Sequence, residues 1–288
     1  MSKVALMTDT TSNMPKTWIE RYGIYIVPVY VIFGNESYRD YVDMPAEEFY
    51  RRLQAAEEMP KTSQPTPTDF VHAYKAAQAN GATDVIGVYV TAKASGTCTS
   101  AQLAADMVEG LNVHVVDSAS TSLPMSWMLV EAAKALEQGG SAEEALQAVE
   151  KVKANNALVF TVTEVKHLVH SGRTIGAERA AQAQVKVKPI VSLEDGRPQA
   201  VGTERTQRSA LNRVINLVKE KLGGRKLKGL GVVHGGIEEK GKAFAQDVKK
   251  AFAYDGDVVV VDFGPALAVH FGPGLLGVAA YWEEGEAH

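Results

Sequence analysis

The chain has 288 residues, of which 45% are hydrophobic and 22% are charged, and its formal net charge is −4. This length can form two compact domains, and the composition is typical of a globular protein and not of a disordered chain. The negative balance argues against a nucleic-acid partner, because proteins that bind the phosphate backbone carry a basic face. The only cysteine, Cys98, excludes a disulfide framework and a cysteine-based zinc site.

We expect a cytoplasmic protein that makes at most transient contact with a membrane. The first residues lead directly into an apolar segment without the pattern of a signal peptide. No apolar stretch has the length that a bilayer-spanning helix needs. A lone cysteine also fits a reducing compartment.

Strand and helix patterns alternate along the first half of the chain. Short apolar runs predict strands at residues 4–8, 25–33, 85–90 and 113–116. Capping residues and closing glycines predict helices at 45–57, 66–80 and 122–137, another that ends near residue 109, and one that opens at Ser141. This alternation predicts a parallel sheet covered by helices, as a three-layer α/β/α domain.

The second half of the chain has a different pattern. Two strand-like runs, 185–193 and 199–204, flank the turn signal Glu194-Asp195-Gly196-Arg197 and predict a hairpin. Helices are predicted at 206–222 and 238–253, and strands at 230–233, 258–261 and 278–281. A hairpin combined with strand–helix units predicts a two-layer α/β domain with a mixed sheet. We place the two domains at residues 1–158 and 159–288.

Hydroxyl-bearing loops follow several of the predicted strands, at residues 9–12, 62–65, 95–97 and 117–118. Ligand sites of parallel sheets lie at the carboxyl ends of the strands. The loop at 95–97 also opens a helix, whose free N–H groups favour an anion. It lacks the Gly-Lys-Ser/Thr ending of a nucleotide-binding loop and the G-x-S-x-G pattern of a nucleophile elbow. A hydrolase that uses Ser95 with His270 as base stays an alternative.

Two groups of histidines are candidates for chemistry. His167 and His170 are three residues apart, but no third metal ligand is evident near them, so we expect a structural or exposed role. His270 precedes the turn-like segment 271–274, which can hold its side chain in place. One histidine among several hydroxyls can bind a carboxylate by hydrogen bonds. Arg173 and Arg205 are of the residue type best suited to phosphate and partner recognition.

Seven segments resemble, in the correct order, motifs of the DegV family of fatty-acid-binding proteins. That family includes the FakB subunits of bacterial fatty acid kinase. The resemblance covers essentially the whole chain, and seven ordered matches are far more specific than one. The segments are TDTTSNMP, KTSQPTPTDF, ASGTCTSA, VVDSASTS, HSGRTIGA, VKPIVSLEDG and HFGPGLLGV.

The resemblance implies a two-domain α/β protein with one long-chain fatty acid buried between the domains. Its carboxylate would be held by residues matched to the family motifs, which are Thr62, Ser63, Ser95, Gly96 and His270. The matched arginines, Arg173 and Arg205, would lie near the mouth and contact the kinase subunit and its phosphate. Cys98 and Phe271 depart from the family pattern, and we expect ordinary core packing for both.

The implied function is that of a non-enzymatic, lipid-binding subunit. The protein would present the carboxylate of its fatty acid to a partner ATP-dependent kinase, and the acyl phosphate would serve phospholipid synthesis. No cofactor and no metal is expected besides the bound fatty acid. Two alternatives stay open, a lipid-ester hydrolase that uses Ser95 and His270, and a sensor of small carboxylates.

Overall fold

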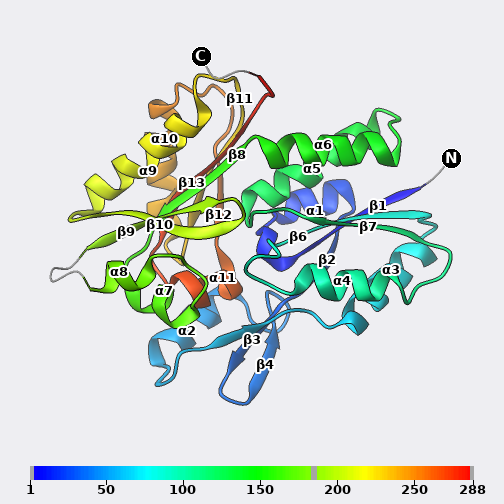
Figure 1. Cartoon of the computed structure of the whole chain (residues 1–288), viewed down its shortest axis with the longest axis horizontal. Helices are drawn as coiled ribbons and strands as arrows, with labels where there is room; N and C mark the ends of the chain where they lie inside the picture. The colour runs from blue at the N-terminus through cyan, green and yellow to red at the C-terminus, as the bar shows by residue number, and fades with distance from the viewer. Residues whose placement is uncertain (1–2, 183–186, 286–288) are drawn as a thin grey trace.

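The computed structural model describes residues 3–182 and 187–285 (Figure 1). The first half of the chain forms a four-stranded parallel sheet in the order β2-β1-β6-β7. Its strands are β1 (Val4–Asp9), β2 (Tyr25–Val27), β6 (Asp84–Tyr89) and β7 (Asn112–Asp117). All six residues of β6 are buried, as expected for a central strand covered on both faces. The predicted parallel sheet is confirmed.

Helices cover both faces of this sheet. Met7, Val85 and Tyr89 pack against one layer, and Leu6, Ile86 and Val88 pack against the other. The first layer contains α3 (Pro67–Ala79) and α4 (Thr97–Ala105). The second contains α1 (Lys16–Tyr22), α5 (Leu123–Glu137) and α6 (Ala142–Ala154). The capping boxes of α3 and α6, opened by Thr66 and Ser141, are formed as their sequences indicate.

The second half of the chain forms a six-stranded mixed sheet in the order β10-β9-β8-β13-β11-β12, in which only β11 and β12 are parallel. Its strands are β8 (Asn156–Thr161), β9 (Lys188–Glu194), β10 (Arg197–Glu204), β11 (Leu227–His234), β12 (Val259–Asp262) and β13 (Leu276–Trp282). On one face pack α9 (Gln207–Leu222) and α10 (Glu238–Ala251). The predicted mixed sheet is confirmed.

The hairpin predicted around residue 195 is present as β9 and β10. Asp195 and Gly196 both have positive φ, at 47° and 75°, as a two-residue hairpin turn of this type requires. The predicted first strand began at residue 185, and residues 185 and 186 lie outside the described part of the chain. The division of the chain after residue 158 stays a prediction, and β8, which spans it, belongs wholly to the six-stranded sheet.

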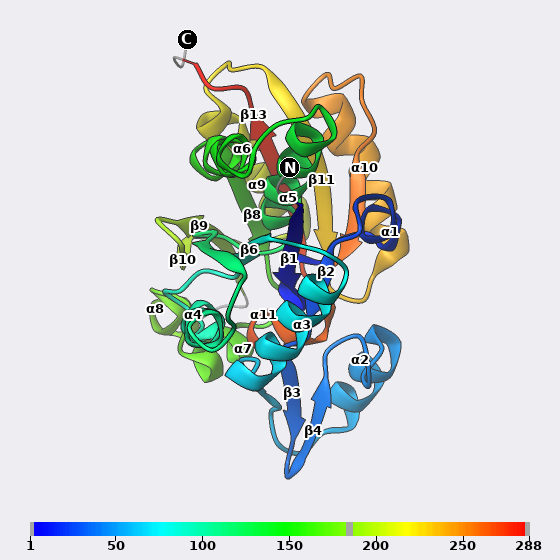
Figure 2. The same ribbon diagram turned by 90° about the vertical axis from the view of Figure 1, so that its right-hand side faces the viewer.

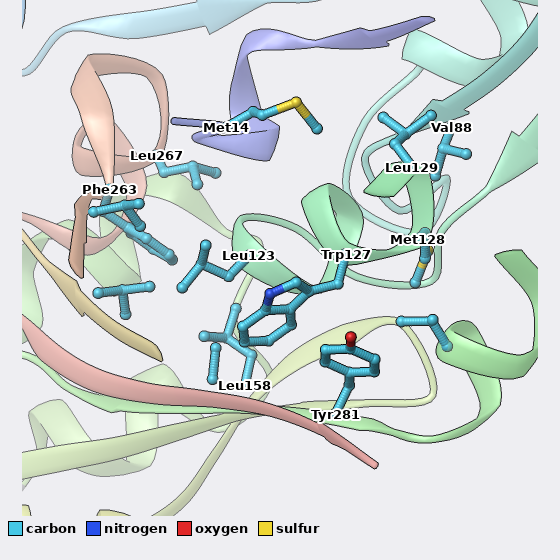
Figure 3. Packing of buried hydrophobic residues seen from close by; sticks show 14 of the residues in the cluster. Met14, Val88, Leu123, Trp127, Met128, Leu129, Leu158, Phe263, Leu267 and Tyr281 are labelled. Atoms are coloured by element: carbon cyan, nitrogen blue, oxygen red, sulfur yellow. The ribbon is translucent and has the colours of Figure 1, made fainter. Parts of the chain in front are cut away.

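Helix α5 joins the two halves by lying between their sheets. Ten of its residues are buried, and its Trp127 packs against Tyr281 of β13 with ring centroids 5.0 Å apart (Figure 3). Gly231 of β11 leaves room for Leu123 of the same helix, because a Cβ at Gly231 would lie 2.3 Å from Cδ1 of Leu123. The apolar core therefore continues from one sheet through α5 to the other.

A third, three-stranded sheet was not predicted. It contains β3 (Tyr30–Phe33), β4 (Glu36–Arg39) and β5 (Lys61–Ser63), in the order β4-β3-β5. The apolar run 25–33 resembles one strand, but Pro28 lacks the N–H that a continuous strand needs, and β2 and β3 belong to different sheets. Figures 1 and 2 show this sheet and α2 (Ala46–Ala55) at one end of the molecule, next to α11 (Gly264–Phe271).

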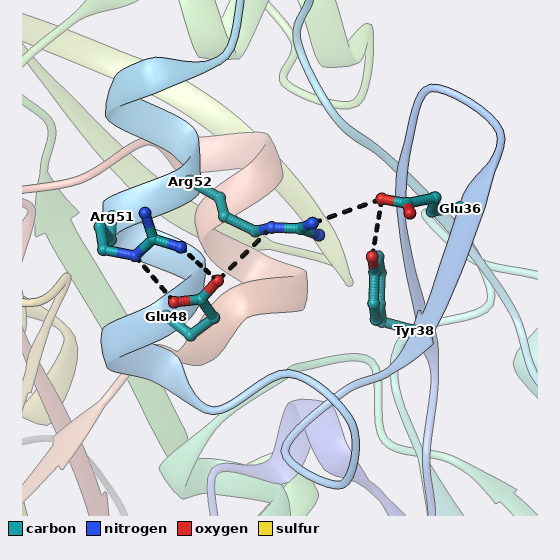
Figure 4. A network of polar contacts seen from close by, with 5 residues as sticks. All are labelled: Glu36, Tyr38, Glu48, Arg51 and Arg52. Atoms are coloured by element: carbon teal, nitrogen blue, oxygen red, sulfur yellow. Dashed lines mark hydrogen bonds and ion pairs between the residues drawn. The ribbon is translucent and has the colours of Figure 1, made fainter.

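Exposed ion pairs connect α2 with this small sheet. Arg52 pairs with Glu36 of β4 at 3.3 Å and with Glu48 of its own helix at 3.5 Å (Figure 4). The guanidinium of Arg52 also lies over the ring of Tyr38, 4.9 Å from its centroid. Exposed pairs of this kind contribute little to stability. The buried Phe49 and Met44 are therefore the main anchors of this region.

Three helices of the second half were not predicted, namely α7 (Val165–Ser171), α8 (Ala177–Ala181) and α11 (Gly264–Phe271). Helix α11 contains His270 in its final turn, whereas the sequence indicated only that this residue precedes a turn. All eight residues of α11 are buried, so its sequence shows no polar face. Within the described residues, no helix has the length and apolar character needed to cross a membrane.

Candidate functional site

A cavity of about 330 Å³ lies where the parallel sheet, the three-stranded sheet and the second half of the chain meet. This volume is within the range of small-molecule sites in proteins. Apolar side chains from both halves line it, including Val29, Val90, Leu193, Leu267 and Phe271. Polar side chains gather along the rest of its wall. The cavity thus combines an apolar space with a concentrated set of hydrogen-bonding groups.

The central polar contact of the cavity joins Thr62 and His270. Thr62 lies in β5, and its Oγ1 is 2.8 Å from Nε2 of His270, which lies at the end of α11. Nδ1 of His270 is buried and has no hydrogen-bond partner among the described residues. Buried polar atoms without a partner are costly, so Nδ1 is an unsatisfied polar atom of this site.

The imidazole of His270 is neutral at pH 7 in this arrangement. Burial lowers its pKa to about 3, and the positive charges of Arg173 and His170 act in the same direction. A neutral imidazole carries one N–H, so it can donate one hydrogen bond and accept another. The group facing the cavity is therefore a hydrogen-bonding partner and not a fixed positive charge.

Ser95 and Gly96 lie in the loop between β6 and α4, and both line the cavity. The Oγ of Ser95 is 2.9 Å from Oγ1 of Thr97 and also accepts a hydrogen bond from the Thr97 N–H at 3.3 Å. This loop opens α4, so its free N–H groups and the helix dipole favour negative charge nearby.

Buried and half-buried carboxylates hold this loop in place. Asp9 at the end of β1 accepts from the Val90 N–H at 2.9 Å, and Asp117 at the end of β7 accepts from the Ala92 N–H at 3.1 Å. On the other side, Thr91 donates to the carbonyl of Gly196 at 2.6 Å. The loops at 9–12 and 117–118, which sequence analysis considered as ligand sites, thus include residues that position the loop carrying Ser95.

The structure explains why residue 96 is a glycine, which the sequence alone does not show. Its φ is −84°, so the backbone does not require glycine. Its Cα instead faces the side chain of Gln64, and a Cβ there would lie 2.5 Å from Nε2 of that residue. Gln64 also lines the cavity and lies 3.5 Å from the hydroxyl of Ser100. The space beside Gly96 is therefore used by an amide that sequence analysis did not select.

Ser63 lines the cavity as well, next to Thr62 in β5. Its hydroxyl donates to the carbonyl of Gln64 at 3.2 Å, so in this structure it is engaged with the backbone. Of the predicted carboxylate-binding residues, all five line one cavity: Thr62, Ser63, Ser95, Gly96 and His270. Their role in holding a carboxylate stays a prediction.

The structure separates the two predicted arginines. Arg173 lines the cavity, and its guanidinium donates to the carbonyls of Ala94 at 3.2 Å and Ser171 at 2.9 Å. Arg205 is exposed in the bend after β10 and does not line the cavity. A role for Arg205 in partner contact therefore rests on the sequence resemblance.

The other residues that the sequence singled out have ordinary surroundings or lie at the cavity edge. His167 is buried and packs on Gly272, whereas His170 is exposed. Cys98 is half-buried, burial raises the pKa of its thiol to about 12, and it does not line the cavity. Phe271 does line the cavity and packs edge-on against Phe160 with centroids 4.9 Å apart.

Several polar lining residues were not on the predicted list, among them Thr11, Gln64 and Thr121. Thr11 lies in one of the loops that sequence analysis considered, and Gln64 belongs to the Thr-Ser-Gln-Pro segment. Thr121 comes from the segment before α5, and no local signal distinguished it from a capping residue. All three residues thus lie in the motif segments, Thr121 in VVDSASTS, but only the fold shows that they share a cavity.

Comparison with known proteins identifies the family. The DegV family, which is described as a family of uncharacterised proteins, matches residues 3–283. The chain belongs to the DegV family. A DegV domain-containing protein of Halalkalibacterium halodurans is 31% identical over 249 residues, which cover 86% of this chain and 88% of the relative. One of Listeria monocytogenes is 30% identical and covers 84% of this chain and 86% of its own.

Solved structures of DegV proteins have the same fold. A Thermus thermophilus DegV family protein, described by its fatty acid binding, has a TM-score of 0.87 and 29% identity, covering 97% of this chain and 99% of its own. A Thermotoga maritima protein described as revealing a fatty acid binding function has a TM-score of 0.87 and 28% identity, covering 98% and 100%. A stearic acid-binding protein of Eubacterium ventriosum has a TM-score of 0.88 and 26% identity, covering 98% of each chain.

Proposed function

We propose that this DegV protein binds a long-chain fatty acid in the cavity and presents its carboxylate to a partner kinase. The carboxylate would lie at the polar end, near Thr62, Ser95 and His270. The acyl chain would lie along the apolar wall that includes Val29, Leu193 and Leu267. The observation that carries this proposal is one cavity holding both kinds of surface, in a fold shared with proteins described as fatty acid binding.

The energetics of the cavity support a lipid with a charged head. A buried carboxylate is costly unless it accepts hydrogen bonds, and the hydroxyls, the imidazole and the start of α4 supply donors. Each buried CH₂ of the tail contributes about 0.8 kcal/mol before the costs of binding are subtracted. The tail would therefore give most of the affinity, and the head group would fix the orientation.

The proposed chemistry takes place on a partner and not on this chain. A kinase would transfer the γ-phosphoryl group of ATP to a carboxylate oxygen of the bound fatty acid. An O–P bond forms to that oxygen, the bond from the γ-phosphorus to the bridging oxygen breaks, and ADP leaves with the electron pair. The acyl phosphate would then serve phospholipid synthesis. Arg173 at the cavity supports this proposal by placing a cation next to the head-group site.

The geometry does not favour the hydrolase alternative. A serine hydrolase needs its nucleophile within hydrogen-bond reach of its base. Ser95 instead pairs with Thr97 at 2.9 Å, and the imidazole of His270 pairs with Thr62 at 2.8 Å. A sensor of small carboxylates would need only the polar end of the cavity, so it leaves the apolar wall without a role.

Direct binding and phosphorylation test the proposal together. Delipidated protein should bind palmitate or oleate with a stoichiometry of one, and an ATP-dependent fatty acid kinase should phosphorylate the bound lipid but not the free lipid. Acetate and butyrate serve as controls and should give no comparable affinity. Tight binding of the short acids alone would point to the sensor, and turnover of a chromogenic acyl ester that Ser95→Ala abolishes would point to the hydrolase.

A further inference from the structure

A buried carboxyl group that the proposed binding mechanism does not use lies behind the cavity wall. Asp40 is 1% exposed and begins the turn at residues 40–44, between β4 and α2, at the end of the molecule that Figure 2 shows below α11. Its N–H donates to the carbonyl of Val29 at 2.9 Å, and its carboxyl group accepts from the N–H of Ala266. Val29 and Ala266 both line the cavity, so Asp40 supports part of its apolar wall.

The turn at residues 40–44 is fitted against the start of α11. Ala266 is the third residue of this helix, so its N–H has no partner within the helix and is free to donate to Asp40. Tyr41 has a φ of 59°, a left-handed conformation that is costly for a bulky residue. Its hydroxyl occupies the space beside Gly264, where a Cβ would lie 2.4 Å from it. The other end of the same short helix carries His270, so a shift of the helix start also displaces the head-group site.

The charge of an ionised Asp40 has no counter-charge. Within residues 3–182 and 187–285, Oδ1 of Asp40 is buried without a hydrogen-bond partner, and no cationic side chain forms an ion pair with this residue. The adjacent Arg39 pairs instead with Asp43, at 2.8 Å. The charged groups that face Asp40 are two further carboxyl groups, those of Asp9 at the end of β1 and Asp262 at the end of β12.

The other titratable groups around this cluster do not compensate that charge. Burial raises the pKa of the Tyr41 and Tyr50 hydroxyls well above the usual range, so both stay protonated. Nδ1 of His234 lies 3.2 Å from the carboxylate of Asp262, on the far side of that residue's contact with Tyr50 at 3.0 Å. His270 stays neutral, because burial lowers its pKa to about 3.

Asp40 therefore exchanges its proton near neutral pH. Burial raises its pKa to about 7, although the hydrogen bonds from Thr10 and Ala266 act in the opposite direction, and the negative charges of Asp9 and Asp262 raise it further. A fatty acid carboxyl group in water has a much lower pKa and stays ionised in this range.

We propose that Asp40 is a proton-controlled clasp of the fatty-acid site, which holds the turn at residues 40–44 against α11 when protonated and releases it when ionised. An ionised, unpaired carboxylate is stabilised by contact with water, and that contact requires the turn to separate from α11. The negative charge of a bound fatty acid acts in the same direction, because like charges disfavour each other's ionised form. The inference rests on the proposed function and adds its control by protons.

The pH dependence of oleate binding tests the clasp. We expect the wild type to bind monomeric oleate at least about fivefold more weakly at pH 8.5 than at pH 6, which is the lower end of the usual coupling between two sites. Asp40→Asn keeps the shape of a protonated carboxyl group and has no proton to lose. Its affinity for oleate should therefore change by less than about twofold over the same range. Titration calorimetry measures both.

Asp43→Asn is the matched control, because it removes a carboxylate from the same turn. Hydrogen bonds from Arg39 lower the pKa of Asp43 to about 2, so this group stays ionised from pH 6 to 8.5. The control variant should keep the pH dependence of the wild type. A flat profile in Asp43→Asn, or an unchanged pH dependence in Asp40→Asn, would overturn the assignment to Asp40.

Proton uptake gives a second readout that needs no variant. The heat of oleate binding at pH 7.5, measured in buffers of different ionisation enthalpy, should reveal uptake of a fraction of a proton by the wild type and none by Asp40→Asn. Binding to the wild type without proton uptake would overturn the clasp even if Asp40→Asn fails to fold. Oleate binding that is independent of pH would leave the proposed function standing, whereas failure to bind oleate at any pH would remove it.

Discussion

The Oγ1 of Thr62 lies 2.8 Å from Nε2 of His270, although 208 positions separate the two residues in the chain. Thr62 belongs to the small three-stranded sheet, and His270 belongs to a helix of the second half. Their hydrogen bond forms only when these parts are packed together. The polar end of the cavity is therefore a product of the whole fold and not of one loop.

The first prediction concerns this pair. Thr62→Val keeps the shape of the side chain and removes the hydroxyl, so a bound carboxylate loses a donor and His270 loses a partner. We expect the fatty acid to bind about 10- to 100-fold more weakly, as for the loss of a hydrogen bond to a charged group. Isothermal titration with palmitate measures this.

Ser63→Ala provides a comparison in the next position of the same strand. Its hydroxyl donates to the backbone, so the loss of affinity should be smaller than that for Thr62→Val. Equal losses in the two variants would show that the hydroxyl of Ser63 turns to the ligand when the fatty acid binds.

The second prediction concerns the contact between Gly96 and Gln64. Gly96→Ala places a methyl group 2.5 Å from the amide of Gln64, so that side chain must move out of the cavity wall. Because that amide is the far end of an exposed, flexible side chain, we expect a loss of no more than about 1 kcal/mol in the free energy of unfolding, together with weaker binding of the fatty acid. Chemical denaturation measures the first effect and titration the second.

Two further variants make this prediction specific. Gln64→Ala combined with Gly96→Ala should recover most of the lost stability, because the clash is removed. Gly202→Ala is the matched control, since no atom lies within 4 Å of its added Cβ and its backbone does not require glycine. A double variant no more stable than Gly96→Ala alone would contradict the contact.

The third prediction concerns pH. Burial lowers the pKa of His270 to about 3 from its ordinary value of 6.5, so between these pH values the unfolded chain binds more protons than the folded chain. The free energy of unfolding is therefore unaffected by this group above pH 6.5 and decreases as the pH falls toward 3. Between pH 7.5 and pH 5, this group alone should remove about 2 kcal/mol from the free energy of unfolding.

His270→Gln isolates this effect, because glutamine does not titrate. As the pH is lowered from 7.5 to 5, the wild type should lose about 2 kcal/mol more unfolding free energy than the variant does. Chemical denaturation of delipidated protein at several pH values measures it. A difference that is independent of pH would contradict the buried, neutral imidazole.

The fourth prediction separates ligand binding from partner contact. We expect Arg173→Ala and Arg205→Ala each to keep fatty acid binding within about threefold of the wild type, since exposed charges contribute little on their own. Both should slow phosphorylation of the bound lipid by the kinase. Steady-state assays with saturating fatty acid measure this, and loss of fatty acid binding in both variants would show that the arginines act on the ligand.

Much of the fold could be predicted because local signals determine it. Thr66 and Ser141 open helices with capping boxes, and the Asp195-Gly196 turn specifies a hairpin. The small sheet was missed because Pro28 divides an apolar run that resembles one strand. Helix α11 was missed because it is buried on every side, so its sequence lacks the alternation of polar and apolar faces.

The sequence predicted which segments contribute to the site, but it did not predict how their residues are arranged in space. The segments containing Thr62, Ser95 and His270 were selected from the sequence, and the structure brings them to one cavity. The role of Gln64 beside Gly96 could not be predicted, because it depends on a contact between the residue after β5 and the loop after β6. Arg173 and Arg205 appeared equivalent in sequence, and only the fold places one at the cavity and the other away from it.

The central claim is that the cavity holds one long-chain fatty acid, and mass spectrometry of the purified protein tests it most directly. Native spectra should show a bound mass equal to one fatty acid per chain, and organic extraction should release that acid and give its length and unsaturation. Thr62→Val should retain less of it after the same purification. A protein that carries no lipid, and takes up none when palmitate or oleate is added, would contradict the account.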